Sequence, residues 1–295
     1  MDRIDRVARE VFGFDALRPG QRDAIEAVLD GRDALAVMST GSGKSAIYQI
    51  AGMLTPGATV VVSPLIALQR DQVTALRERT DAGAAQLNSQ IRAGEREAAL
   101  HELHEDALEF LFLAPEQLAN EDVLAELATA DVSLLVVDEA HCISEWGHDF
   151  RPEYLRLGAA IEALGRPTVL ALTATAAPPV REEIVERLGL RDPVLVVRGF
   201  DRPSIRVGVD RFHSARHRDR ALLEHVAAQP KPGIVYTATR RRAEELAEAL
   251  GDRGVRARAY HGGMTKGERD EVQAAFMEDQ VDAVVATTAF GMGID

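Results

Sequence analysis

The sequence predicts an α/β protein in which parallel strands alternate with helices, organised as two successive units. Short apolar runs rich in β-branched residues alternate with amphipathic stretches along all 295 residues. Strands that are buried on both faces read as continuous apolar runs, and strand–helix alternation indicates crossover connections within a parallel sheet. Turn-forming residues follow a strand-like run at 194–197, so we place the first unit at 1–198 and the second at 199–295.

The expected elements alternate in order along the chain. Apolar runs predict strands in the first unit at 34–38, 59–63, 110–114, 132–137 and 168–173, and in the second at 204–210, 233–236, 257–260 and 281–286. Apolar residues at helical spacing predict helices over segments that include 21–29, 44–54, 65–79, 152–164, 178–188, 239–250 and 266–278. The second unit has fewer expected strands, so its sheet should be the smaller one.

Composition and charge exclude several classes of protein. The chain is 46% hydrophobic, enough for a sizeable core, and no apolar run approaches the roughly 18 residues of a membrane span. Its single cysteine, Cys142, excludes a disulfide framework and a multi-cysteine zinc site and favours the cytoplasm, with nucleoid association if the source is bacterial. The net charge of −13 alone argues against a polyanionic partner, but residues 197–295 hold 16 basic and 15 acidic side chains, so charge does not decide the partner.

A glycine-rich loop, MSTGSGKS at 38–45, follows the first expected strand and opens a helix. Its two glycines let successive main-chain N–H groups converge on an anion, and the start of the helix adds its positive dipole end. The lysine supplies a charge for the β- and γ-phosphates, and the serine after it supplies a hydroxyl for Mg²⁺. The candidate nucleotide-binding residues of this loop are Thr40, Gly41, Ser42, Gly43, Lys44 and Ser45.

Two neighbouring acids, Asp138 and Glu139, end the apolar run of LLVVDEAH at 134–141. Parallel α/β sheets bind ligands at the carboxyl ends of their strands. One carboxylate can hold Mg²⁺ and the other can polarise an attacking water, so we assign Asp138 with Ser45 to the metal, and Lys44, Asp138 and Glu139 to catalysis. The alternative for this motif alone is an exposed acidic turn, but the phosphate loop upstream favours the metal site.

Together the two motifs resemble those of superfamily-2 helicases, and neighbouring residues narrow the resemblance. The run DEAHCISEWGHDFRPEY at 138–154 is similar to the extended motif II of RecQ-family DNA helicases, with their aromatic-rich loop. Segments in the family's order follow at 12–21 (FGFDALRPGQ), 61–73 (VVSPLIALQRDQV), 172–176 (LTATA), 199–205 (GFDRPSI), 233–247 (GIVYTATRRRAEELA), 260–264 (YHGGM) and 285–295 (VATTAFGMGID). The resemblance covers nearly the whole chain and implies two RecA-like P-loop NTPase domains that bind ATP and Mg²⁺.

The resemblance also implies roles for individual residues. It assigns Phe14, Arg18 and Gln21 to adenine recognition, where a glutamine amide can pair with the adenine edge. The aromatic-rich loop mixes rings with a guanidinium, as single-strand stacking surfaces do, although a lone tryptophan and phenylalanine would otherwise be read as core residues. The residues expected to sense DNA or to relay its binding to the ATP site are His141, Trp146, Phe150, Arg151, Thr173 and Thr175.

In the second unit, Tyr236, Thr237 and Arg240 resemble helicase motif IV, and residues 287–295 resemble motif V. Such motifs face the first unit across a cleft in the family. Arg240 either contacts a phosphate or lies in solvent at the start of an amphipathic helix, and the sequence leaves both interpretations open.

The implied function is that of an ATP-dependent 3′→5′ DNA helicase in DNA repair and recombination. It would couple ATP hydrolysis to movement along single-stranded DNA and to unwinding at duplex junctions. No motif VI, whose arginines complete the ATP site in the family, occurs before Asp295, so we expect this chain to bind nucleotide and to hydrolyse it weakly. The alternatives are a non-catalytic nucleotide- or DNA-binding fragment and a different superfamily-2 translocase.

Overall fold

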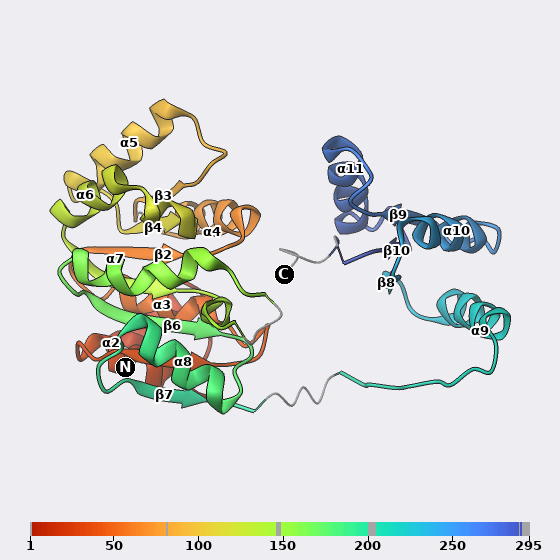
Figure 1. Ribbon diagram of the computed structural model, residues 1–295, viewed down its shortest axis with the longest axis horizontal. Helices are drawn as coiled ribbons and strands as arrows, with labels where there is room; N and C mark the ends of the chain where they lie inside the picture. The colour runs from red at the N-terminus through yellow and green to blue at the C-terminus, as the bar shows by residue number, and fades with distance from the viewer. Residues whose placement is uncertain (1, 81, 146–148, 200–204, 289, 291–295) are drawn as a thin grey trace. The chain divides into compact units, whose positions relative to one another are not determined.

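The protein forms two compact units in a computed structural model that describes residues 2–80, 82–145, 149–199, 205–288 and 290 (Figure 1). The units are Met1–Asp201 and Arg202–Ile294, and each is described by itself. Within the described residues, no helix is both long enough and apolar enough to cross a lipid bilayer.

The first unit is built on a seven-stranded sheet whose paired strands are all parallel, in the order β3-β4-β2-β5-β6-β1-β7. Its strands are β1 (Ala34–Val37), β2 (Ala58–Val62), β3 (Ala84–Leu87), β4 (Phe110–Leu113), β5 (Val132–Val137), β6 (Thr168–Thr173) and β7 (Val194–Val197). The register pairs Val37 of β1 with Thr173 of β6. The carboxyl ends of β1, β6 and β5 are therefore neighbours at one edge, which brings the segments that follow them together.

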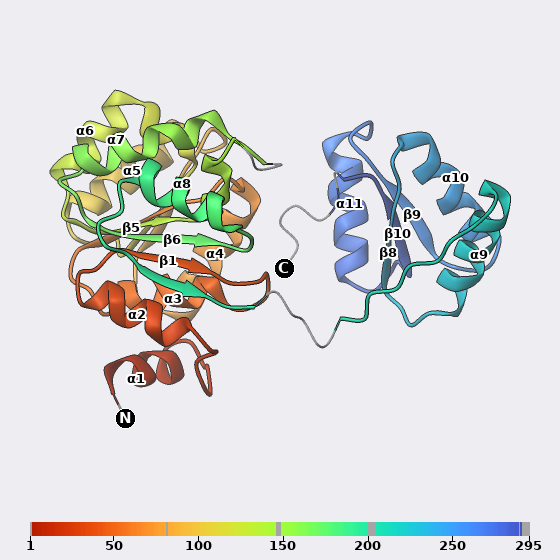
Figure 2. The ribbon, with the colours of Figure 1, turned by 60° about the horizontal axis from the view of Figure 1, so that its bottom comes forward.

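Helices cover both faces of this sheet (Figure 2). They are α1 (Arg3–Glu10), α2 (Gln21–Leu29), α3 (Lys44–Gly52), α4 (Ile66–Arg79), α5 (Ala93–His104), α6 (Glu121–Thr129), α7 (Leu157–Ala163) and α8 (Pro178–Leu188), with 3₁₀ turns η1 (Pro115–Ala119), η2 (Ala140–Ile143) and η3 (Pro152–Arg156). Alternate strand residues enter two separate cores: Leu35 and Val37 pack with α5 to α8, whereas Ala34 and Ala36 pack with α1 to α4. Burial on both faces explains why these strands are continuous apolar runs.

The second unit has a smaller parallel sheet in the order β8-β10-β9. Its elements are α9 (Ala215–Ala228), β8 (Gly233–Tyr236), α10 (Arg240–Gly251), β9 (Ala257–Tyr260), α11 (Lys266–Met277) and β10 (Ala283–Ala286). One face of β10 packs with α9 and α10, and the other packs with α11 (Figure 2).

The α/β fold class is confirmed, and two details of the expected elements are corrected. Residues 205–210 form no strand although a strand was expected at 204–210. The apolar side chains there alternate as in an edge strand, but Val207 and Val209 are 85% and 84% exposed, so no neighbouring sheet buries them. Conversely, β3 was not among the expected strands, because its sequence AAQL lacks β-branched and aromatic residues.

Candidate active site

The glycine-rich loop after β1 forms a cradle of main-chain N–H groups. Gly41 and Gly43 have φ of +74° and +80°, a region that glycine alone enters without strain, and Gly43 caps α3. Ser42 N donates back to Ser39 O over 3.1 Å. In the described chain the amides of Gly41, Gly43 and Lys44 donate to no other group. Unpaired amides at the start of a helix bind anions, so this loop fits a phosphate.

Lys44 connects the loop to the two acids after β5. Its Nζ donates to Met38 O over 3.3 Å, which folds the side chain back over the loop. Its positive charge also lowers the pKa of Asp138 and of Glu139. The structure thus brings the phosphate loop and the paired acids into one electrostatic environment.

Asp138 is held in place by hydrogen bonds to both of its carboxylate oxygens. Oδ1 accepts from Glu139 N over 3.0 Å, and Oδ2 accepts from the Ser63 hydroxyl over 3.5 Å. Burial, followed by repulsion from Glu139, raises the pKa of Asp138 to about 6, more than Lys44 and the hydrogen bonds lower it. A nearby cation would stabilise the ionised form of this buried carboxylate, because it would compensate the negative charge.

The pKa of Glu139 is shifted in the opposite direction to that of Asp138. Burial acts to raise the pKa of Glu139, but His141 and then Lys44 hold it below its usual value. Glu139 Oε2 lies 3.3 Å from His141 Nδ1. The same nitrogen is 2.9 Å from Thr173 Oγ1, and Glu139 Oε2 has no aligned hydrogen bond among the described residues.

His141 joins the acids to the end of β6. Its Nδ1 contacts Thr173 Oγ1, and that hydroxyl in turn donates to Thr175 O over 3.1 Å. Contact with Glu139 raises the pKa of His141, helped by Asp149 and opposed by burial. Through these contacts His141 links the segment that follows β5 to the end of β6.

Residues near the start of the chain pack onto the outside of the phosphate loop. Gln21 is only 4% exposed, its Nε2 donates to Gly43 O over 2.8 Å, and its Oε1 accepts from Arg18 N over 2.7 Å. The Arg18 guanidinium donates to Gly41 O. Phe14 is half-buried and stacks on Phe12, with ring centroids 5.9 Å apart. The Gln21 amide, expected on adenine, is therefore engaged here with the loop itself.

The last residues of the RecQ-like run, 150–154, contact the segments that surround the paired acids. Arg151 N donates to Cys142 O over 2.9 Å, and its guanidinium donates to Pro64 O over 3.4 Å. Phe150 is half-buried, and Trp146 lies outside the described residues. Tyr154 was not among the site residues expected from the sequence. Its hydroxyl donates to the main-chain oxygen of Asp138 over 2.9 Å. Its position within the RecQ-like run at 138–154 was the available signal.

The residues at this edge fit Mg²⁺ and a nucleoside triphosphate. Ser45 and Asp138 supply oxygen ligands of the kind that Mg²⁺ prefers. Two side-chain oxygens, Ser42 Oγ and Glu139 Oε2, are buried without a hydrogen-bond partner in the described chain, as expected of groups that await a ligand.

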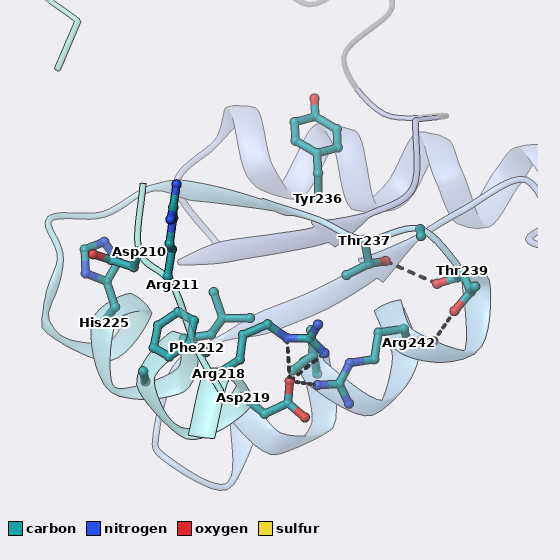
Figure 3. Close-up of a pocket in the computed structure, with 14 residues that line it drawn as sticks. Asp210, Arg211, Phe212, Arg218, Asp219, His225, Tyr236, Thr237, Thr239 and Arg242 are labelled. Carbon is teal, nitrogen blue, oxygen red and sulfur yellow. Dashed lines mark hydrogen bonds and ion pairs between the residues drawn. The ribbon is translucent and has the colours of Figure 1, made fainter. Parts of the chain in front are cut away.

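The second unit holds a cavity of about 910 Å³ between α9, β8, the start of α10 and residues 210–212 (Figure 3). Asp219 pairs there with Arg218 and Arg242, and Tyr236 points away from this pair. Arg240 lies against the turn at Gly263. Among the described residues that line this cavity there is no glycine-rich loop and no pair of adjacent acids like that at 138–139.

A parallel sheet with a phosphate loop after one strand and paired acids after another defines a P-loop nucleoside triphosphatase. The family model for the DEAD/DEAH box helicase matches residues 18–184, and that for the helicase conserved C-terminal domain matches residues 217–295. The chain therefore belongs to the DEAD/DEAH box helicase family.

Curated relatives point to one branch of that family. The chain is 41% identical to the probable ATP-dependent DNA helicase RecS of Bacillus subtilis over 296 residues, covering 100% of this chain and 59% of that protein. It is also 41% identical to the ATP-dependent DNA helicase RecQ of Pasteurella multocida over 290 residues, covering 98% of this chain and 45% of that protein. The RecQ resemblance is thereby confirmed, and the chain spans about half the length of these relatives.

Solved structures agree on the fold. The helicase Lhr of Mycobacterium smegmatis, bound to ssDNA and AMP-PNP, matches all of this chain and 43% of its own with a TM-score of 0.72 at 23% identity. The DUF1998 helicase MrfA, bound to DNA, matches all of this chain and 43% of its own with a TM-score of 0.75 at 20% identity. At these identities the likeness concerns the fold alone.

Proposed function

We propose that this chain is the ATP-hydrolysing motor of a RecQ-type 3′→5′ DNA helicase that acts in DNA repair and recombination. The proposal rests mainly on the unpaired amides of Gly41, Gly43 and Lys44, which share the charge of Lys44 with the acids Asp138 and Glu139. The curated relatives, named as DNA helicases, support DNA as the partner.

In this proposal each residue of the site has a distinct task. The loop amides and Lys44 bind the β- and γ-phosphates. Ser45 and Asp138 would hold Mg²⁺, which neutralises phosphate charge when it is bound. Glu139 orients the attacking water and accepts its proton, and its low pKa keeps it ionised at neutral pH.

Gln21 and Arg18 hold the phosphate loop in its conformation before any contact with the base. Their hydrogen bonds to Gly43 O and Gly41 O hold those carbonyls outward, which leaves the amides of the loop facing the phosphates. Adenine recognition by Gln21, which the family resemblance implies, would then require its amide to exchange a loop contact for the base.

The link to DNA runs through the residues that follow motif II. We propose that single-stranded DNA binds at Phe150 and Arg151 and changes the setting of Glu139 through the contacts of His141 with Thr173. Contacts to the DNA backbone should make affinity fall with salt and depend little on sequence.

The test is ATP hydrolysis by wild type, Lys44→Ala and Lys231→Ala, each with and without single-stranded DNA. Lys231 lies at the amino end of β8, so its loss removes one lysine charge without touching the site. We expect DNA-stimulated hydrolysis in wild type and Lys231→Ala and only background in Lys44→Ala. Equal, DNA-independent background in all three would favour the non-catalytic alternative, and strand displacement with 3′- and 5′-tailed duplexes then tests polarity.

A further inference from the structure

The peptide that joins Asp138 to Glu139 is held at both of its polar groups. Its carbonyl, the main-chain oxygen of Asp138, accepts a hydrogen bond of 2.9 Å from the Tyr154 hydroxyl. Its N–H, on Glu139, donates to Asp138 Oδ1 over 3.0 Å. Because the carbonyl and the N–H of a planar trans peptide point in opposite directions, the two hydrogen bonds together fix the orientation of this peptide.

That orientation matters because Glu139 has a backbone conformation that a residue with a side chain rarely adopts. Its φ is +48°, in the left-handed region. Such a residue persists only where its surroundings over-determine it, and it is typical of functional sites. Rotation of the preceding peptide would take Glu139 out of this conformation and move its carboxylate away from His141.

Tyr154 is well placed to provide this restraint. Its side chain is fully buried and packs in the same core as Ala140 and Ile143, which directly follow the acids. Its own amide donates to Arg151 O over 3.0 Å, and Arg151 N donates to Cys142 O over 2.9 Å. Tyr154 is therefore bonded through its hydroxyl to Asp138 and through its main-chain amide to Arg151, the residue that the family resemblance assigns to sensing DNA.

We propose that Tyr154 is a positioning residue for ATP hydrolysis. Its hydroxyl holds the Asp138–Glu139 peptide in the orientation that directs the Glu139 carboxylate, and Tyr154 couples this orientation to the position of Phe150 and Arg151. This role presupposes the function proposed above, because it concerns the same site. A shift of the segment at 150–154 on binding DNA would reach Glu139 through the Tyr154 hydroxyl.

The test is Tyr154→Phe in the 295-residue chain, which removes the hydroxyl and keeps the ring in the core. We expect the DNA-stimulated turnover number to fall by about 5- to 30-fold, the effect of losing one hydrogen bond to a buried carbonyl. The ratio of the DNA-stimulated to the basal rate should fall too. The KM for ATP and the affinity for a fluorescent ATP analogue should change by less than about twofold, because the phosphate loop is untouched.

Tyr48→Phe is the matched control. Tyr48 is also buried in the first unit, and its hydroxyl donates to Gln72 Oε1 over 3.3 Å. Its loss should lower thermal stability about as much as the loss of the Tyr154 hydroxyl does, and it should leave both the turnover number and the DNA stimulation at wild-type values.

Two results would overturn this role for Tyr154. One is a Tyr154→Phe variant with wild-type turnover with and without DNA. The other is a Tyr154→Phe variant in which the DNA-stimulated turnover number, the nucleotide affinity and the DNA-independent rate all fall by the same factor relative to wild type. That result would indicate a packing role only. Both leave the proposed function standing, whereas wild-type hydrolysis no faster than that of Lys44→Ala would defeat the proposed function and this role with it.

Discussion

Replacing Asp138 with asparagine should stabilise the first unit above pH 6 while it removes a ligand of the metal. Burial, with repulsion from Glu139, raises the pKa of Asp138 from 3.8 to about 6. The folded unit therefore binds this proton more tightly than the unfolded chain does. As the pH rises from about 4 to 6, the unfolded state loses the proton first, and the fold loses stability.

The size of this effect follows from the pKa difference. About two pKa units at 1.36 kcal/mol each give about 3 kcal/mol. The Asp138 side chain keeps some contact with solvent, which screens part of this penalty, so we expect Asp138→Asn to gain about 1–3 kcal/mol at pH 8. The gain should shrink as the pH falls from 6 to 4 and be small below pH 4, where Asp138 is protonated in both states.

Urea unfolding at pH 4, 6 and 8 measures this gain. Pulsed hydrogen exchange, read on peptides from β5, follows the unfolding of the first unit. Asp71→Asn, on the exposed face of α4, is the matched control and should show no such pH dependence. An Asp138→Asn variant that is less stable than wild type at pH 8, or one whose gain is the same at pH 4 and pH 8, would refute the reasoning.

Three further substitutions test other parts of the site and fold. Glu139→Gln removes a charge at constant size. A coupled ATPase assay should therefore show a turnover number at least about 100-fold lower than that of wild type, with nucleotide affinity retained. Gly43→Ala should weaken binding of a fluorescent ATP analogue, since its Cβ would lie 2.6 Å from Gln21 Nε2 and would displace that amide from the loop, whereas Gly31→Ala, with φ of +69° and open space around it, should bind normally. Burial raises the pKa of Glu109 to about 7, so Glu109→Gln should raise the midpoint of urea unfolding at pH 8 and leave it unchanged at pH 4.

The sequence predicts most of this fold because its signals are local. Continuous apolar runs mark strands that are buried on both faces, and the glycines of MSTGSGKS by themselves indicate a sharply turning loop. A strand also needs a neighbouring strand, which a local pattern does not supply. The strand expected at 204–210 is therefore absent: residues 205–210 show the alternating pattern, but no strand of the described chain pairs with them.

Contacts between segments are the part that the sequence did not predict. Nothing local in Gln21 shows that its amide bonds to the carbonyl of Gly43, and nothing local in Tyr154 shows that its hydroxyl reaches the carbonyl of Asp138. Both contacts depend on how α2 and η3 pack against the carboxyl edge of the sheet, which follows from tertiary structure. The raised pKa of Asp138 likewise depends on burial that only the assembled edge creates.

We propose that one Mg²⁺-bound triphosphate is held jointly by the loop at 41–45 and by Asp138. The most direct test is the affinity for a fluorescent ATP analogue with and without Mg²⁺, measured for wild type and for Asp138→Asn at pH 8. We predict that Mg²⁺ tightens binding to wild type by about tenfold, equivalent to about 1.4 kcal/mol, and changes binding to Asp138→Asn by less than about twofold. An equal effect of Mg²⁺ on both proteins would contradict the claim.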